Sequence, residues 1–124
     1  MTLKEQIKRN CVDLPVELVE IIPWLSMESP PSGKVIMFML AGWSAPSLQS
    51  FRLLTKEIAA MAQPPRLLVI DVNDLDADGF EQRFGHLPQG MGEAYWFKDR
   101  VLIRSDQGYR SAAITLLRQN LADF

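Results

Sequence analysis

The stretch KVIMFMLAGWSAPS, from Lys34 to Ser47, decides the fold of this chain. Its apolar first half does not alternate with polar residues, which is typical of a central strand buried on both faces. Pro46 suits the first turn of a helix, where its fixed φ and missing N–H are tolerated, and Ser44 suits the N-cap before it. We therefore predict a strand in the middle of a sheet, a tight turn and a helix.

A long helix and a second buried strand follow this turn. The apolar residues of the helix recur at helical spacing, namely Leu48, Phe51, Leu54, Ile58 and Met61. Two prolines, Pro64 and Pro65, end the helix, and the apolar run Arg66–Val72 predicts a further strand. Two strands joined by a helix form a right-handed unit with parallel strands.

The C-terminal third predicts a short helix, a hairpin and a final helix. Residues 80–84 form the short helix, and Gly85 can occupy the position that ends it. Residues 93–97 and 101–104 flank a charged turn and predict a β-hairpin, although the turn lacks the usual glycine. The final helix begins at about Tyr109, and its predicted apolar face carries Ala112, Ala113, Leu116, Leu117 and Leu121.

The N-terminal part is less regular. Thr2 and Glu5 have the spacing of a capping box, ahead of a short helix with one apolar face formed by Leu3, Ile7 and Cys11. Residues 16–21 fit either a first edge strand or a helix that Pro15 begins, and we favour the strand. The Pro- and Ser-rich residues 29–33 predict a loop.

Length and charge limit the class of protein. At 124 residues the chain has room for one domain, residues 1–124, with an N-terminal helix and lead-in over 1–33 and a core over 34–124. A net charge of −2 does not suggest a nucleic-acid partner. The polar start lacks the apolar segment of a secretory signal, and no apolar run approaches the roughly 20 residues of a membrane span. We expect a cytoplasmic protein with no membrane partner.

The order of these features resembles the thioredoxin family, whose signature is an apolar strand followed by Trp-Cys-Gly-Pro-Cys at the start of a helix. The resemblance runs from Val35 to the C-terminus. It is supported by three further local matches: Ile70-Asp71-Val72 at a strand end, Arg83-Phe84-Gly85 at a helix end, and Phe97-Lys98-Asp99 before the hairpin turn. It implies a three-layer α/β/α fold with a mixed sheet of four to five strands.

The chain departs from the family where the family performs its chemistry. Ser44 and Ser47 replace the two cysteines, and a serine hydroxyl stays protonated and has no sulfur to exchange. Phe38 stands where active members carry a buried Asp, and Met91-Gly92-Glu93 stands where they place a cis-proline. The resemblance therefore implies a protein without disulfide oxidoreductase activity.

What the resemblance leaves is a docking surface for a protein or peptide partner. Relatives that lack the cysteine pair act as accessory chaperones or assembly factors, and we expect a comparable role without a cofactor or metal. The docking surface expected from the family comprises Trp43, Ser44, Ala45, Pro46, Ser47, Met91 and Gly92.

An enzyme of another class is the alternative. Ser44 lies in a sequence that approaches a nucleophile elbow, with Asp71 and His86 as possible triad partners, but Pro46 replaces the second glycine, so a capping serine is favoured. A thiol-dependent enzyme would use Cys11, the only cysteine, which we interpret instead as a small buried or half-buried apolar residue.

Two weaker patterns indicate structure more than chemistry. His86 is the only histidine and has no second ligand type near it in sequence, so we interpret it as a surface loop residue. Residues 74–79 follow the first half of an EF-hand loop, but Gly85 occupies the twelfth position, where the loop requires a Glu. We expect no tight calcium site.

Overall fold

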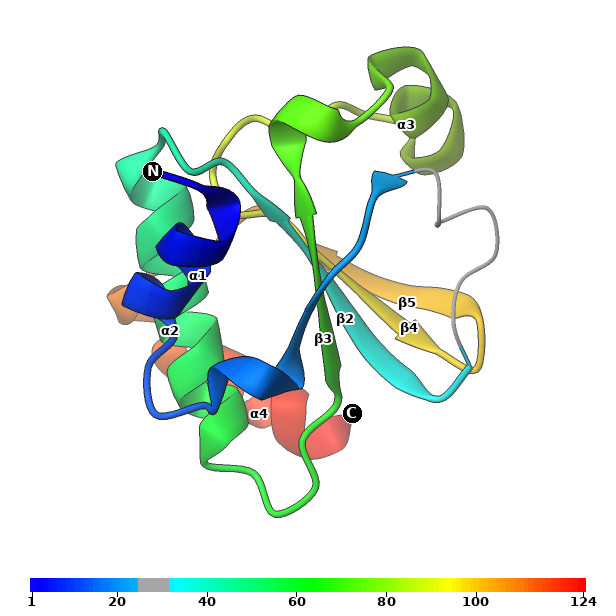
Figure 1. Cartoon of the computed structure of the whole chain (residues 1–124). Coiled ribbons are helices and arrows are strands. Elements are labelled where there is room, and N and C mark those ends of the chain that lie inside the picture. The colour runs from blue at the N-terminus through cyan, green and yellow to red at the C-terminus, as the bar shows by residue number, and fades with distance from the viewer. Residues whose placement is uncertain (25–31) are drawn as a thin grey trace.

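The computed structural model describes residues 1–24 and 32–124 and shows one sheet with helices on both faces (Figure 1). The sheet has five strands in the order β1-β3-β2-β4-β5. β3 pairs in parallel with β1 and β2, whereas β4 is antiparallel to β2 and β5. The strands are β1 (Val19–Ile21), β2 (Lys34–Leu40), β3 (Arg66–Asp71), β4 (Ala94–Lys98) and β5 (Val101–Asp106). This confirms the predicted mixed sheet.

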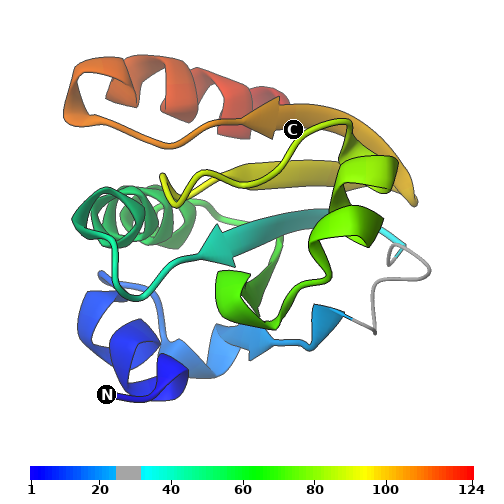
Figure 2. The same ribbon diagram turned by 90° about the horizontal axis from the view of Figure 1, so that it is seen from above.

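Three helices cover one face of the sheet and one covers the other, as Figures 1 and 2 show. One hydrophobic cluster joins the sheet to α1, α2 and α4, and a second cluster joins its opposite face to α3. The helices are α1 (Leu3–Asn10), α2 (Ala45–Ala59), α3 (Ala77–Phe84) and α4 (Ile114–Asp123). The three layers α/β/α are those implied by the resemblance. In the described ranges no helix combines the length and the apolar character needed to cross a membrane.

The central strand β2 is buried along its length after Lys34. Phe38 belongs to the cluster under α2, whereas its neighbours Met37 and Met39 belong to the cluster under α3. Alternate side chains of a strand point to opposite faces, so a strand covered on both faces requires an unbroken apolar sequence. Burial on both faces therefore explains why apolar and polar residues do not alternate in this strand, as predicted.

Helix α2 follows the predicted pattern. Ser44 is its N-cap and a proline lies in its first turn. Phe51, Leu54 and Ile58 are buried against the sheet, as their helical spacing predicts. The inner face also buries Ser47 and Ser50, two polar positions that the apolar pattern does not include.

The N-terminal part combines the two alternatives left open by the sequence. Residues Val16–Leu18 form one turn of 3-10 helix, and only Val19–Ile21 form the edge strand β1. Arg66 of β3 forms an ion pair with Glu20 of β1 at 2.8 Å, which joins the two strands at their exposed side. Most of the loop predicted at residues 29–33 lies outside the described residues.

The hairpin turn forms without glycine. Asp99 and Arg100 have φ values of +49° and +73°, the sign that a two-residue hairpin turn requires at both positions. The Asp99 N–H donates to the Gly33 carbonyl at 2.9 Å, and the Asp99 carboxylate accepts from the Gly33 N–H at 3.2 Å. These bonds compensate for the strain of a left-handed conformation at residues other than glycine.

The predicted start of the last helix is wrong, and its predicted apolar face is right only in part. The α-helix begins at Ile114 after a turn of 3-10 helix, because Tyr109 is held by bonds to the sheet and to α2. Leu117 and Leu121 are buried as predicted, but Leu116 is 53% exposed. Ala112 and Ala113 are also exposed, and Phe124 completes the buried face.

Candidate functional site

Trp43 lies in the turn between β2 and α2, at the edge of the sheet where the parallel strands end. Its side chain is 67% exposed, the largest exposed fraction among the large apolar residues that the structure describes. One edge of the indole lies against Gly90, where an added Cβ would approach the Trp43 Cη2 atom to 2.7 Å. Gly90 also has a φ of +74°, so both its backbone and its neighbour favour glycine. Trp43 also lines a depression together with Met1, Leu3 and Gln6 of the N-terminal segment, Asp71 at the end of β3 and Asn73 after it.

Ser44, next to this tryptophan, serves the backbone. Its hydroxyl accepts from the Ser47 N–H at 3.3 Å, which is the expected N-cap bond. The same hydroxyl donates to the Gly90 carbonyl, so it also joins the start of α2 to the loop before β4. Ser44 is only 8% exposed. Both the donor and an acceptor site of its oxygen are therefore used inside the protein.

Ser47 and Ser50 continue this arrangement along the inner face of α2, and both are fully buried. The Ala41 N–H donates to the Ser47 hydroxyl at 2.9 Å. Ser50 donates to the Gly92 carbonyl at 2.9 Å and accepts from the Tyr109 N–H at 2.8 Å. The hydroxyls of α2 thus satisfy buried backbone groups of three separate segments, a role that buried polar groups need to fill.

Phe38 and Gly92, two positions at which the chain differs from the thioredoxin family, lie next to each other. Phe38 is fully buried and packs edge-on against Phe51, with ring centroids 5.2 Å apart. A Cβ added at Gly92 would lie 3.0 Å from Phe38 Cζ and would collide with the Ser50 side chain. Gly92 also has a φ of +80°, which proline cannot adopt because its ring holds φ near about −65°. The loop therefore has no room for the family's proline.

Glu93 organises the loop that faces Trp43. It is 3% exposed, and its carboxylate accepts from the Met91 N–H at 3.2 Å and from the Gln89 N–H. Its own carbonyl accepts from the Met39 N–H of β2 at 2.9 Å. Sequence patterns alone did not predict this role for Glu93. The available signal was a carboxylate placed directly before the buried strand Ala94–Lys98, where a charge requires a specific partner.

A groove follows this loop. One depression, of about 440 Å³, is lined by His86, Leu87, Gln89, Met91, Glu93, Ser105, Asp106 and Gln107. A second, of about 580 Å³, is lined by Pro46, Gln49, Met91, Gln107, Gly108, Tyr109 and Arg110. The two depressions share the lining residues Met91 and Gln107 and therefore lie side by side, and we call them together the groove. The groove leads from His86 to the first turn of α2.

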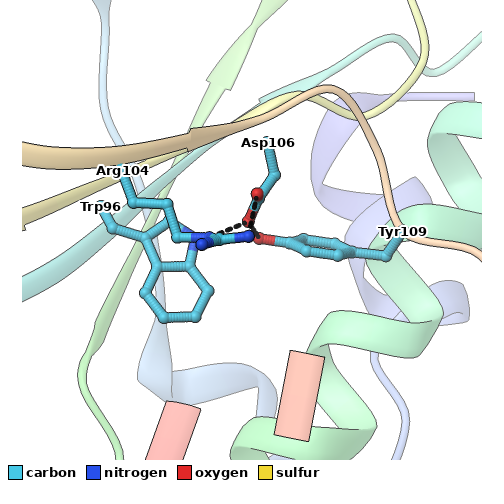
Figure 3. A network of polar contacts seen from close by, with 4 residues as sticks. All are labelled: Trp96, Arg104, Asp106 and Tyr109. Atoms are coloured by element: carbon cyan, nitrogen blue, oxygen red, sulfur yellow. Dashed lines mark hydrogen bonds and ion pairs between the residues drawn. The ribbon is translucent and has the colours of Figure 1, made fainter. Parts of the chain in front are cut away.

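A polar network joins Trp96, Arg104, Asp106 and Tyr109 (Figure 3). Two of its members, Asp106 and Tyr109, also line the groove. The Tyr109 hydroxyl donates to Asp106 at 2.7 Å and accepts from the Trp96 indole N–H at 2.8 Å. Arg104 bonds both oxygens of Asp106, at 2.9 and 3.1 Å, and its guanidinium lies 5.8 Å from the centre of a Trp96 ring. Burial, and then the Asp106 charge, raise the pKa of Tyr109. The phenol therefore stays protonated and keeps its donor role.

The structure divides the predicted docking residues into two groups. Trp43, Ala45 and Pro46 are exposed and Met91 is half-buried, so these four side chains reach the surface. Ser44, Ser47 and Gly92 are buried beneath them. The first group can contact a partner directly, whereas the second group holds the turn, the helix and the loop together.

The residues of the alternative enzyme hypotheses are engaged elsewhere. His86 Nε2 lies 2.8 Å from the Tyr95 hydroxyl, and in the described part of the chain no hydrogen bond joins His86 to Ser44. The Cys11 thiol is half-buried and donates to the Leu14 carbonyl at 3.1 Å. Burial, and then the Glu17 charge, raise the pKa of Cys11, which opposes formation of a thiolate at neutral pH. Residues 1–24 and 32–124 contain no group of three or more His, Cys, Asp or Glu side chains placed to hold a metal ion.

No family model matches the chain, and no curated protein matches it. Solved structures of thioredoxins do match. Mitochondrial thioredoxin 3 from Saccharomyces cerevisiae, in its oxidised form, is 21% identical with a TM-score of 0.64, over 86% of this chain and 95% of the yeast chain. Thioredoxin Mala s 13 from Malassezia sympodialis is 16% identical with a TM-score of 0.60, over 84% of this chain and 90% of its own. Schistosoma mansoni thioredoxin is 14% identical with a TM-score of 0.60, over 86% and 94%.

These likenesses show that the chain has the thioredoxin fold, and they confirm the resemblance at that level. The chain keeps the strand, the turn and the helix on which a thioredoxin carries its cysteine pair, but its single cysteine lies in the segment after α1.

Proposed function

We propose that the chain is a binding module that docks a polypeptide partner on the surface formed by Trp43, Ala45, Pro46 and Met91, in the manner of an accessory chaperone or assembly factor. The exposure of Trp43 carries this proposal, since 67% of a large aromatic side chain faces solvent. Aromatic residues bury much apolar area on binding and dominate the energetics of many interfaces. α/β proteins also place their binding crevices at this edge of the sheet.

The neighbouring residues support a docking role. Pro46 is exposed and held rigid at the start of α2, and Met91, across the turn, offers a flexible side chain that adapts to different partners. Ser44 and Ser47 bond backbone groups beneath them. The turn thus has the rigidity that lowers the entropic cost of binding.

We also propose that the chain carries out no thiol–disulfide exchange. Exchange requires a thiolate that attacks a disulfide and a second thiol that resolves the mixed disulfide. Neither Ser44 nor Ser47 has a sulfur atom, and the pKa of Cys11 is raised. We expect no turnover above a buffer blank in an insulin reduction assay. Reproducible turnover would contradict this part of the proposal.

The test compares Trp43→Ala with Leu116→Ala, a matched truncation of another exposed apolar residue. We expect Trp43→Ala to lose less than about 2 kcal/mol of unfolding free energy, because an exposed side chain leaves no core cavity. We also expect it to lose capture of the native partner from an extract of the host, while Leu116→Ala captures it normally. Urea melts and quantified pull-downs on both variants measure this. A Trp43→Ala variant that is folded and captures the partner as well as wild type refutes the docking surface.

A further inference from the structure

The groove beside Met91 carries its charges at opposite ends. We propose that it selects an extended segment of the partner with a basic residue at one end, an apolar residue in the middle and an acidic residue at the other end. This inference rests on the proposed function and names the chemistry of its partner. Two observations support it: the distribution of charge along the groove, and the backbone N–H groups of the Met91 loop, which already donate hydrogen bonds within the protein.

The end near His86 is acidic. Glu93 and Asp106 line this depression, and no Lys or Arg lines it. Asp106 is already paired with Arg104, whereas Glu93 forms no ion pair with any residue that the structure describes. Glu93 accepts hydrogen bonds from two backbone N–H groups, and no cationic side chain in the described ranges pairs with it. A basic side chain of the partner supplies the missing positive charge.

The other end is basic. Among the residues that the structure describes, Arg110 is the one charged residue lining the second depression. It is exposed, and its guanidinium forms no ion pair within the described ranges. Its backbone is fixed because its carbonyl accepts from the Ala113 N–H at 3.0 Å, in the 3-10 turn before α4. An acidic side chain of the partner can therefore pair with the Arg110 guanidinium, which extends from a backbone position held by this bond.

The middle of the groove is suited to side-chain contacts more than to strand pairing. The N–H groups of Gln89 and Met91 donate to the Glu93 carboxylate, so they are not free to bond the main chain of a partner. Met91, shared by both depressions, supplies the apolar contact, and the carboxamides of Gln49, Gln89 and Gln107 line the groove around it. Amide side chains can bond any extended main chain. Sequence preference then comes from the charges at the two ends.

The experiment uses nuclear magnetic resonance titration of the ¹⁵N-labelled full chain with short peptides. The probe is acetyl-Gly-Lys-Gly-Leu-Gly-Glu-Gly-amide, and the control replaces its Lys and Glu by Gln. We expect the charged peptide to shift the amide signals of Met91, Gln107 and Gly108 and to bind at least about tenfold more tightly than the neutral one. Attraction between exposed charges is screened by salt, so we expect the difference to shrink as salt is added.

Charge variants of the protein make the test independent of the peptide. Gln107→Lys places a cation between the two depressions and Arg110→Glu reverses the basic end, and both residues are exposed, so the fold is retained. We expect both variants to lose the preference for the charged peptide. We also expect Arg110→Glu to prefer a peptide with Lys in place of its Glu. Lys4→Glu, an equal charge change on exposed α1, leaves the preference unchanged.

The outcomes separate this inference from the proposed function. Equal affinity for the charged and neutral peptides, with the shifts at Met91 retained, overturns the charge preference and leaves polypeptide docking supported. Shifts that avoid the groove, or a preference unaffected by Gln107→Lys and Arg110→Glu, also overturn it. Failure of the proposed function would appear elsewhere, as unchanged partner capture by Trp43→Ala.

Discussion

Two tryptophans of this chain occupy opposite environments. Trp96 lies on β4, is 1% exposed, and donates its indole N–H to Tyr109 at 2.8 Å. Trp43 lies in the turn before α2 and is 67% exposed. The same residue type is thus a fixed part of the core in one region and an accessible surface in the other. The difference lies in the backbone: a central strand is covered on both faces, whereas a turn at the sheet edge projects its side chain outward.

The largest expected effect is that of Trp96→Ala. Removal of a buried tryptophan leaves a cavity, and we expect a loss of about 3–5 kcal/mol in unfolding free energy. Trp43→Ala, with the same change of side chain, loses less than about 2 kcal/mol. Urea unfolding of the two variants in parallel measures the contrast, and Trp96→Phe serves if Trp96→Ala does not fold. Equal losses for Trp96 and Trp43 would remove the distinction between the two regions.

Tyr109→Phe tests the network around Trp96 more finely. The variant keeps the ring but leaves the buried Trp96 N–H without its acceptor, so we expect a loss of about 1–3 kcal/mol. Tyr95→Phe is the matched control, because its hydroxyl bonds only the exposed His86 among the described residues. We expect that control to lose about 1 kcal/mol or less. A larger loss for Tyr95→Phe than for Tyr109→Phe would show that the network is not what holds this region.

The smallest expected effect concerns the ion pair between Glu20 and Arg66 at the opposite sheet edge. The hydrogen bond from Arg66 lowers the pKa of Glu20, so the stabilisation is present above the ordinary glutamate pKa and is lost as pH falls through the lowered value. Both side chains are about half-exposed, so we expect Glu20→Gln to lose less than about 1 kcal/mol near neutral pH. Urea unfolding curves of wild type and Glu20→Gln at neutral and acidic pH measure this loss of unfolding free energy. A deficit that persists or grows in acid would contradict this interpretation.

Local patterns in the sequence predicted the middle of the fold well. The unbroken apolar run of β2, the N-cap Ser44 and the spacing of Phe51, Leu54 and Ile58 act within a few neighbouring residues, and the structure confirms each. The start of α4 was predicted too early, because its position depends on Tyr109, whose N–H bonds Ser50, 59 residues earlier in the chain. No local pattern contains that contact.

The candidate site could likewise be predicted only where its residues belong to a local pattern. The resemblance to thioredoxins suggested Trp43, Pro46 and Met91 as docking residues, and the structure leaves Trp43 and Pro46 exposed and Met91 half-buried. The sequence did not show that Ser47 is fully buried, or that Glu93 holds its own loop, since these roles depend on backbone groups placed by tertiary structure. The groove depends on the contact of three segments, the start of α2, the Met91 loop and the residues after β5, and was not predicted.

Site-specific photo-crosslinking tests the central claim most directly. A benzophenone amino acid is placed at position 43 in one variant and at position 116 in another, two exposed apolar positions on different elements, and both proteins are irradiated in cells of the native host. We expect a discrete cross-linked polypeptide from position 43 and none above background from position 116. The same cross-linked product from both positions in equal yield, or a product from position 116 alone, would contradict the claim that the Trp43 turn is the docking surface.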